Sequence, residues 1–226
     1  MLIQLPSVLN AEQLDTCTSA LAQADWSDGR GSAGYLSREV KHNRQLPDNH
    51  PLSRELGELI IRVLDGNERF TAAALPMKMV PPLFNCYEDQ GQYGRHVDGA
   101  IRPVTGTPHR VRTDLSATLF LSDPDSYEGG ELVIEDSYGP TEVKLAAGDM
   151  VLYPGGSVHR VNPVTSGRRL AAFFWIQSMV RSDRQRAILF ELDNAIQKIA
   201  GDSPEQLALT DLAGVYHNLL REWADT

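Results

Sequence analysis

The sequence predicts a mainly β protein of the α+β class, in which a β-sandwich or jelly roll is flanked by helices. Short β-rich runs separated by turn residues occupy the middle of the chain, whereas both ends show apolar residues at helical spacing. Several short strands at this close spacing favour a sandwich or jelly roll over βαβ units. A chain of 226 residues can bury such a core without disulfides or structural zinc.

The first part of the chain is predicted to be helical. Asn10 followed by Gln13 resembles a capping box that would start a first helix. The apolar residues on one face of that helix are Leu14, Cys17 and Leu21. Residues 28–50 are polar and rich in glycine, so we expect a loop that crosses the surface. A second amphipathic helix is then marked by Leu52, Leu56, Ile60 and Val63.

The β-rich region begins near Lys78 and extends to about Ile176. The strands expected in it are residues 78–87, 115–121, 131–135, 141–145, 149–153 and 168–177. The turns expected between them include Gly129-Gly130, Tyr138-Gly139-Pro140, Ala147-Gly148-Asp149 and Pro154-Gly155-Gly156.

Helical spacing returns after Ser182. Its apolar positions are Ile188, Leu189, Leu192, Ile196 and Ile199. Ser203-Pro204-Glu205 offers a serine N-cap with proline in the first turn, and residues 214–225 are expected to form a further short helix. We therefore expect three parts: a helical segment at 1–77, a β core at 78–178 and a small helical domain at 179–226.

Composition narrows the classes of function. The formal net charge is −9 and the pI is about 5.1, so the chain repels nucleic-acid phosphates and nonspecific nucleic-acid binding is not expected. Cys17 and Cys86 match no zinc spacing, and we expect two buried reduced thiols. No basic leader and no apolar run of about 18 residues is present, so a cytoplasmic location without membrane contact is the expectation.

Three residues have the pattern of a metal site. His96 and Asp98 are two residues apart, and in an extended segment their side chains point to the same side. His159 follows far along the chain. Two histidines and one carboxylate form the facial triad of non-haem iron oxygenases, which leaves three positions on the metal open. Taken alone, the pair of His96 and Asp98 would favour a solvated loop, because chance pairs with this spacing are common.

The neighbouring residues resemble those of a known family. Residues 87–98 read YEDQGQYGRHVD and resemble the Y-x-x-x-G-x-Y-x-x-H-x-D run of the prolyl-4-hydroxylase-like 2-oxoglutarate dioxygenases. Three further segments match in the same order: GGEL at 129–132, GDMVLYP at 148–154 and PVTSGRR at 163–169. The resemblance is closest to the bacterial PKHD-type hydroxylases, a branch associated with iron uptake that also carries a short helical C-terminal domain.

The resemblance implies a fold and a reaction. The fold would be a double-stranded β-helix, which is a cupin-like jelly roll flanked by helices. His96, Asp98 and His159 would hold ferrous iron, and 2-oxoglutarate would be the co-substrate. A substrate would be hydroxylated with succinate and carbon dioxide as co-products, and ascorbate is expected as an auxiliary reductant.

Two further residues are expected to bind 2-oxoglutarate. Arg169 stands at the family's usual place for the group that binds the distal carboxylate, and a guanidinium can form two charge-assisted hydrogen bonds there. Strand alternation would then put Ala171, Phe173 and Trp175 on the same inner face, whereas the competing interpretation is a surface arginine. Tyr87 resembles the family's tyrosine that hydrogen-bonds the co-substrate, although any buried tyrosine hydroxyl tends to find a partner.

Neighbouring polar residues have other expected places. Tyr93 is expected in the pocket wall near the primary substrate. For Asn85, a plain strand position is favoured over a co-substrate contact.

Alternative functions remain open at this stage. A different cupin-like metalloenzyme would usually bring an H-x-H pair with a nearby glutamate, which the sequence lacks. A noncatalytic sensor of iron or 2-oxoglutarate would keep the same ligands, and a purely structural jelly roll would leave their spacing as coincidence.

The sequence does not identify the primary substrate, which is expected to be a small molecule or a peptide. Residues 99–113 are expected to form a mobile lid whose arginines point to an anionic substrate. The C-terminal helices are expected to mediate a homodimer.

Overall fold

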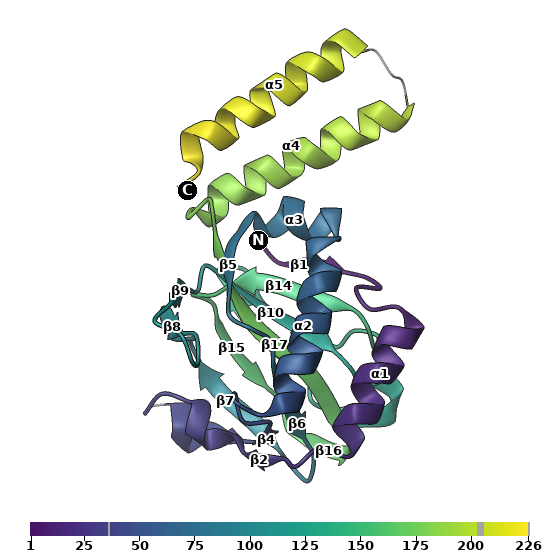
Figure 1. Cartoon of the computed structure of the whole chain (residues 1–226), viewed down its shortest axis with the longest axis vertical. Helices are drawn as coiled ribbons and strands as arrows, with labels where there is room; N and C mark the ends of the chain where they lie inside the picture. The colour runs from purple at the N-terminus through teal and green to yellow at the C-terminus, as the bar shows by residue number, and fades with distance from the viewer. Residues whose placement is uncertain (36, 203–205, 226) are drawn as a thin grey trace.

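Two β-sheets facing one another form the centre of the protein in a computed structural model that describes residues 1–35, 37–202 and 206–225 (Figure 1). The larger, eight-stranded sheet has the order β1-β14-β10-β17-β6-β4-β2, with β5 beside β17. Its strands are β1 (Ile3–Leu5), β2 (Ser27–Asp28), β4 (Arg44–Gln45), β5 (Pro76–Met79), β6 (Leu83–Tyr87), β10 (Leu115–Phe120), β14 (Met150–Pro154) and β17 (Arg169–Ser178). The expected sandwich with flanking helices is confirmed.

The smaller sheet has five strands in the order β13-β12-β15-β7-β3. They are β3 (Lys41–His42), β7 (Gln92–His96), β12 (Leu132–Asp136), β13 (Gly139–Val143) and β15 (Val158–Val161). Two separate strand pairs complete the β structure: β8 (Ile101–Pro103) with β9 (Arg110–Arg112), and β11 (Tyr127–Gly129) with β16 (Val164–Gly167). Short 3-10 turns η1 (Gly29–Ser32), η2 (Ser37–Val40) and η3 (Pro124–Ser126) lie between strands.

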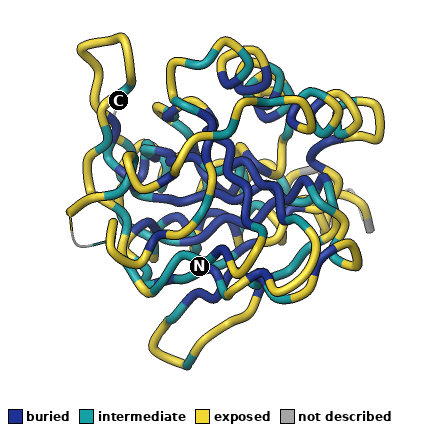
Figure 2. Tube along the Cα trace, turned by 90° about the horizontal axis from the view of Figure 1, so that it is seen from below, coloured by how far each residue is buried: buried dark blue, intermediate teal, exposed yellow. Residues whose placement is uncertain are grey.

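Side-chain alternation divides the larger sheet into two faces. On β10, Leu115, Ala117 and Leu119 belong to the outer core, whereas Ser116 and Thr118 face the space between the sheets. Figure 2 shows the resulting buried strands in the middle of the molecule, with exposed residues in the loops around them. One face of each central strand therefore stabilises the fold, and the other is free to build a site.

Three helices cover the outer face of the larger sheet: α1 (Ala11–Ala22), α2 (Pro51–Asp65) and α3 (Glu68–Ala74). The expected capping box of α1 is confirmed, because Asn10 and Gln13 exchange backbone-to-side-chain hydrogen bonds of 2.9 and 3.0 Å. The apolar face of α2 buries Leu56 and Ile60 in the same core. Helix α3 was not expected, although Asn67 caps it through a hydrogen bond from Phe70 N to Asn67 Oδ1.

Two expectations for the β region and its neighbours were wrong in detail. Residues 28–50 are not simply a surface loop, because β3 and β4 pair with β7 and β6 and carry two buried polar residues, Lys41 and Gln45. The expected strand at 78–87 is interrupted between β5 and β6, where the two consecutive prolines, Pro81 and Pro82, cannot donate ladder hydrogen bonds. Residues 99–113 contain the paired strands β8 and β9, and their expected role as a mobile lid stays a prediction.

The C-terminal residues form a helical hairpin, α4 (Asp183–Asp202) and α5 (Gln206–Trp223), which projects from the sheets (Figure 1). At its base, Leu189 of α4 packs with Leu75 and Val180, and Met179 N donates to Leu75 O at 2.8 Å. The helix expected at 214–225 therefore begins earlier, at Gln206. The expected start at Ser203-Pro204-Glu205 lies outside the described residues, and dimerisation through these helices stays a prediction.

Both cysteines are buried free thiols, as expected, and burial raises the pKa of Cys17 to about 11. No helix in the described part of the chain combines the length and apolar character that a membrane span requires.

The turn at Gly129 is a sensitive point of the fold. Gly129 has a φ of +72°, and a Cβ there would collide with the backbone oxygen of Pro163. We expect Gly129→Ala to lower the free energy of unfolding by about 2 kcal/mol or more, measured by urea denaturation. Gly156→Ala is the matched control, because a Cβ at Gly156 meets no atom within 4 Å. Equal stability of the two variants would contradict this account.

Candidate active site

A cavity opens between the two sheets. Its volume is about 750 Å³, including the part that is open to solvent. Its walls come from the inner faces of β10, β17, β6, β7 and β15 and from residues near β3 and β8.

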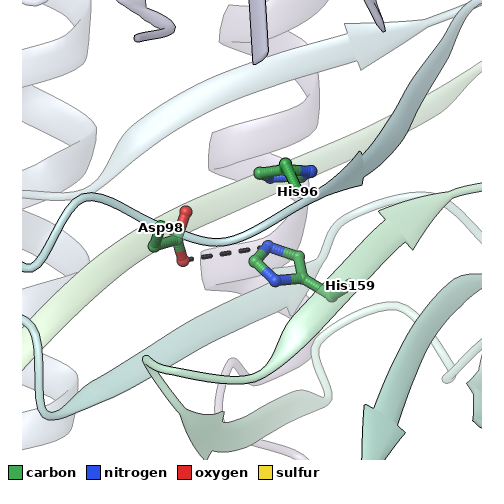
Figure 3. Close-up of side chains that lie close together, drawn as sticks. All are labelled: His96, Asp98 and His159. Atoms are coloured by element: carbon green, nitrogen blue, oxygen red, sulfur yellow. Dashed lines mark ion pairs between the residues drawn. The ribbon is translucent and has the colours of Figure 1, made fainter. Parts of the chain in front are cut away.

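The three expected metal ligands meet in this cavity. His96 ends β7, Asp98 follows two residues later, and His159 lies on β15 directly opposite His96 in the antiparallel register. One ligand atom from each residue lies within 4.8 Å of the others. Figure 3 shows the three side chains converging, with His159 Nε2 at 3.8 Å from Asp98 Oδ2. Among the described residues, no other group of three histidine, cysteine or acidic side chains converges in this way.

Backbone contacts orient both imidazoles. His96 Nδ1 lies 2.8 Å from Gly94 O, and His159 Nδ1 lies 3.0 Å from Ser157 O. When Nδ1–H donates to these carbonyls, Nε2 keeps its lone pair and can bind a metal. Burial, followed by the proximity of His159, lowers the pKa of His96 to about 4, so His96 is neutral near pH 7.

Neighbouring side chains also hold the ligands in place. The ring of Tyr93 stacks on His96 with centroids 3.5 Å apart, and Tyr153 meets His159 edge-on at 5.2 Å. Ser116, which is buried on β10, donates a hydrogen bond of 2.7 Å to Asp98 Oδ2. The carboxylate is thereby oriented from the opposite sheet.

Arg169 points into the cavity, as expected. Its side chain is only 1% exposed, and its guanidinium carbon lies 5.4 Å from the ring centre of Tyr87 and 5.1 Å from that of Phe120. Within the described part of the chain, its Nε and Nη2 atoms have no hydrogen-bond partner. Phe173 and Trp175, from the same strand, line the same cavity. A buried guanidinium with free donors is costly to maintain unless an anion binds it.

Tyr87 lies beside Arg169, because the two residues are register partners on β6 and β17. It is fully buried, and this burial raises the pKa of its hydroxyl, so the group remains a neutral donor. Asn85, two residues earlier, also lines the cavity, and its buried Oδ1 has no partner among the described residues. Asn85 is therefore a wall residue of the cavity rather than a plain strand position.

The donor set fits ferrous iron and a dicarboxylate. Two imidazole nitrogens and one carboxylate suit a non-haem iron centre with open coordination positions. The unpaired guanidinium in the same cavity provides a partner for a distal carboxylate.

Several cavity residues were missed from the sequence. Ser116 and Thr118 gave a usable signal, because two polar residues alternate with Leu115, Ala117 and Leu119 in a strand that is otherwise apolar. Lys41 gave none, because it lies in a polar segment and is buried only through the pairing of β3 with β7.

Comparison with known families agrees with this geometry. The model of the 2OG-Fe(II) oxygenase superfamily matches residues 82–177, and that of the PKHD-type hydroxylase C-terminal domain matches residues 183–225. A PKHD-type hydroxylase from Pseudomonas putida is 59% identical over 225 residues, covering 100% of both chains. The PKHD-type hydroxylase PiuC from Pseudomonas aeruginosa is 54% identical with the same coverage.

Solved structures share the fold at low sequence identity. A prolyl-4-hydroxylase from Pseudomonas putida aligns with a TM-score of 0.53 at 18% identity, covering 78% of this chain and 92% of that one. HygX from Streptomyces hygroscopicus, with nickel, 2-oxoglutarate and hygromycin B bound, gives 0.55 at 16% identity, covering 78% and 82%.

The full-length relatives decide the family, and the solved structures support the jelly-roll fold that the resemblance implied. The chain therefore belongs to the PKHD-type hydroxylases, and it is a 2-oxoglutarate-dependent dioxygenase that uses ferrous iron.

Proposed function

We propose that this enzyme hydroxylates its substrate with iron held by His96, Asp98 and His159 and with 2-oxoglutarate held by Arg169 and Tyr87. One observation carries the assignment: a converging set of three ligand atoms shares its cavity with a buried guanidinium whose Nε and Nη2 have no hydrogen-bond partner among the described residues. A simple metal site would leave the guanidinium without a role, and a simple anion site would leave the ligand set without one.

Each residue has a defined task in this proposal. The backbone-bound imidazoles and Asp98 supply three ligand atoms, and Arg169 and Tyr87 orient the dicarboxylate. With iron and 2-oxoglutarate bound, dioxygen would be the oxidant: one of its oxygen atoms would enter succinate as 2-oxoglutarate loses carbon dioxide, and the other would enter the hydroxylated substrate. The apolar and aromatic side chains of the inner faces exclude water from the site.

The substrate is a small molecule or a peptide that enters the same cavity. The PKHD-type branch that the sequence resembles is associated with iron uptake. We therefore propose that the substrate is a metabolite of iron acquisition, for example of siderophore metabolism. Ascorbate would sustain turnover by keeping the iron ferrous.

Asp98→Ala should abolish turnover. Removing the only carboxylate in the ligand set leaves two imidazoles without an anionic ligand, which bind ferrous iron weakly. Succinate formation, measured with iron, 2-oxoglutarate, oxygen and ascorbate, is expected to fall at least 100-fold. Asp136→Ala changes an exposed carboxylate and serves as the control.

The same Asp98 variant tests the link to iron acquisition. Metabolites from iron-limited cells should contain a hydroxylated product with the wild type that is missing with Asp98→Ala. A product that is independent of iron supply would contradict the proposed link, whereas wild-type levels of succinate from Asp98→Ala would contradict the ligand assignment.

Arg169→Gln should weaken 2-oxoglutarate binding. The change removes two charge-assisted hydrogen bonds, so the Kd for 2-oxoglutarate is expected to rise roughly 100-fold while metal binding persists. Calorimetry under anaerobic conditions measures both. Arg168→Gln is the matched control, because Arg168 points away from the cavity and bonds Cys86. An equal loss of affinity for 2-oxoglutarate in the two variants would refute the role assigned to Arg169.

Ser116→Ala should lower metal affinity about 10- to 100-fold, because the hydrogen bond that orients Asp98 is lost. Competition with a metal-sensitive dye measures this affinity. Ser178→Ala removes another buried serine hydroxyl, remote from the cavity, and should lower stability without changing metal affinity. A Ser116 variant that binds metal like the wild type would show that Asp98 needs no such support.

A further inference from the structure

The charged residues that line the cavity are mostly cationic. Among its described lining residues, Lys41, Arg102 and Arg169 are cations and Asp98 is the one carboxylate. Ferrous iron adds two positive charges, and 2-oxoglutarate removes two. The loaded cavity therefore keeps an excess of two positive charges, in a protein whose net charge is −9. Lys41 and Arg102 are the two cations that neither the metal site nor 2-oxoglutarate uses.

Lys41 is a buried ammonium group without a carboxylate partner. It is 3% exposed, and Nζ donates to Ser32 Oγ at 2.8 Å and to Gln45 Oε1 at 3.0 Å. No ion pair among the described residues includes it. An ammonium group has three donors, so one N–H remains available. Burial, with Arg102 as the next cause, lowers the pKa of Lys41 to about 8.

Arg102 brings a second cation to the same side of the cavity. It lies on β8, and its guanidinium carbon is 4.3 Å from the ring centre of Trp175. The other arginines of this hairpin have different surroundings: Arg112 forms hydrogen bonds of 2.6 and 2.8 Å to Asp114, and Arg110 is exposed. Arg102 is therefore the arginine through which the β8–β9 hairpin contributes a charge to the cavity.

The two cations lie away from the Arg169 end of the cavity. Lys41 Nζ is 5.9 Å from the ring centre of Phe173, and Arg102 stacks on Trp175. A strand advances by about 3.4 Å per residue, so Phe173 and Trp175 are roughly 14 and 20 Å along β17 from Arg169. A dicarboxylate bound between Arg169 and the metal ligands would leave Lys41 and Arg102 free. The aromatic rings beside them offer an apolar surface for the rest of a second molecule.

We propose that the primary substrate carries a carboxylate, which Lys41 and Arg102 bind while the apolar part of the substrate packs on Phe173 and Trp175. This inference rests on the proposed function, because it places the substrate beside the iron and 2-oxoglutarate. Lysine supplies a point charge and arginine a planar fork, and together they favour an anionic group over a neutral amide of the same shape.

Benzoate and benzamide provide a matched pair of probes, since both are planar and aromatic but only benzoate is charged. Each is titrated into anaerobic protein that is loaded with ferrous iron and saturating 2-oxoglutarate, and binding is followed by calorimetry. We expect benzoate to bind the wild type at least tenfold more tightly than benzamide. Lys41→Met and Arg102→Gln should each weaken benzoate binding at least tenfold and change the Kd for 2-oxoglutarate less than twofold.

Two control variants remove the same charges elsewhere. Lys78→Met changes an exposed lysine on β5, and Arg110→Gln changes the exposed arginine on the same hairpin as Arg102. Both should bind benzoate like the wild type. Arg102→Gln lies in a partly exposed strand pair, so it remains informative if Lys41→Met disturbs the buried cluster with Ser32 and Gln45.

The proposal is overturned if benzoate binds no better than benzamide, or if Lys41→Met and Arg102→Gln bind benzoate like the wild type. It is also overturned if these variants lose 2-oxoglutarate instead, because the cations would then serve the co-substrate. Succinate formation without any probe is measured separately, so failure of the dioxygenase assignment is distinguishable from failure of the anion site.

Discussion

The buried, unpaired guanidinium of Arg169 is the constraint on which the functional architecture depends. A charge held at 1% exposure is unfavourable unless an anion binds it, and neither a carboxylate nor a hydrogen-bond acceptor offsets it at Nε or Nη2 among the described residues. The cavity is thus built for a ligand rather than for maximum stability. Gly130 belongs to the same arrangement, since a Cβ there would lie 3.0 Å from Arg169 Cδ. The glycine turn before β12 leaves the space in which the arginine side chain lies.

One face of β10 and β17 stabilises the fold, and the other face lines the cavity. The outward residues of β17, such as Leu170 and Phe174, pack against the helices, whereas the inward residues include Arg169, Phe173 and Trp175. Because the side-chain period is two, a register shift of one residue would exchange these sets. The helices on the outer face therefore fix the register, and through it the positions of the cavity residues. The C-terminal hairpin packs at the edge of this body and contributes no residue to the cavity wall within the described chain.

The local motifs were sufficient to predict the class of fold and to single out four residues that share a cavity. His96, Asp98, His159 and Arg169 lie in short segments with strong spacing, and the structure brings all four to one cavity. Lys41 could not be found in the same way, since its burial arises from pairing with Tyr93, some fifty positions along the chain. Ser116 is an intermediate case: strand alternation places it on the inner face, but only the tertiary structure shows that it meets Asp98. Sequence patterns report local geometry, whereas contacts between sheets depend on nonlocal register.

The contrast between an acidic protein and a cationic cavity bears on how substrate is selected. At long range the net charge of −9 disfavours the approach of anions, and salt screens this repulsion within about 10 Å. Inside the cavity the balance reverses, because Lys41 and Arg102 both line it and the burial of Lys41 strengthens the field of its charge. Such a site discriminates between substrates through the stability of the bound complex rather than through the encounter rate. The cost of desolvating an anion is offset only where the cations converge. A neutral molecule gains nothing from that field, and a cation is repelled by it.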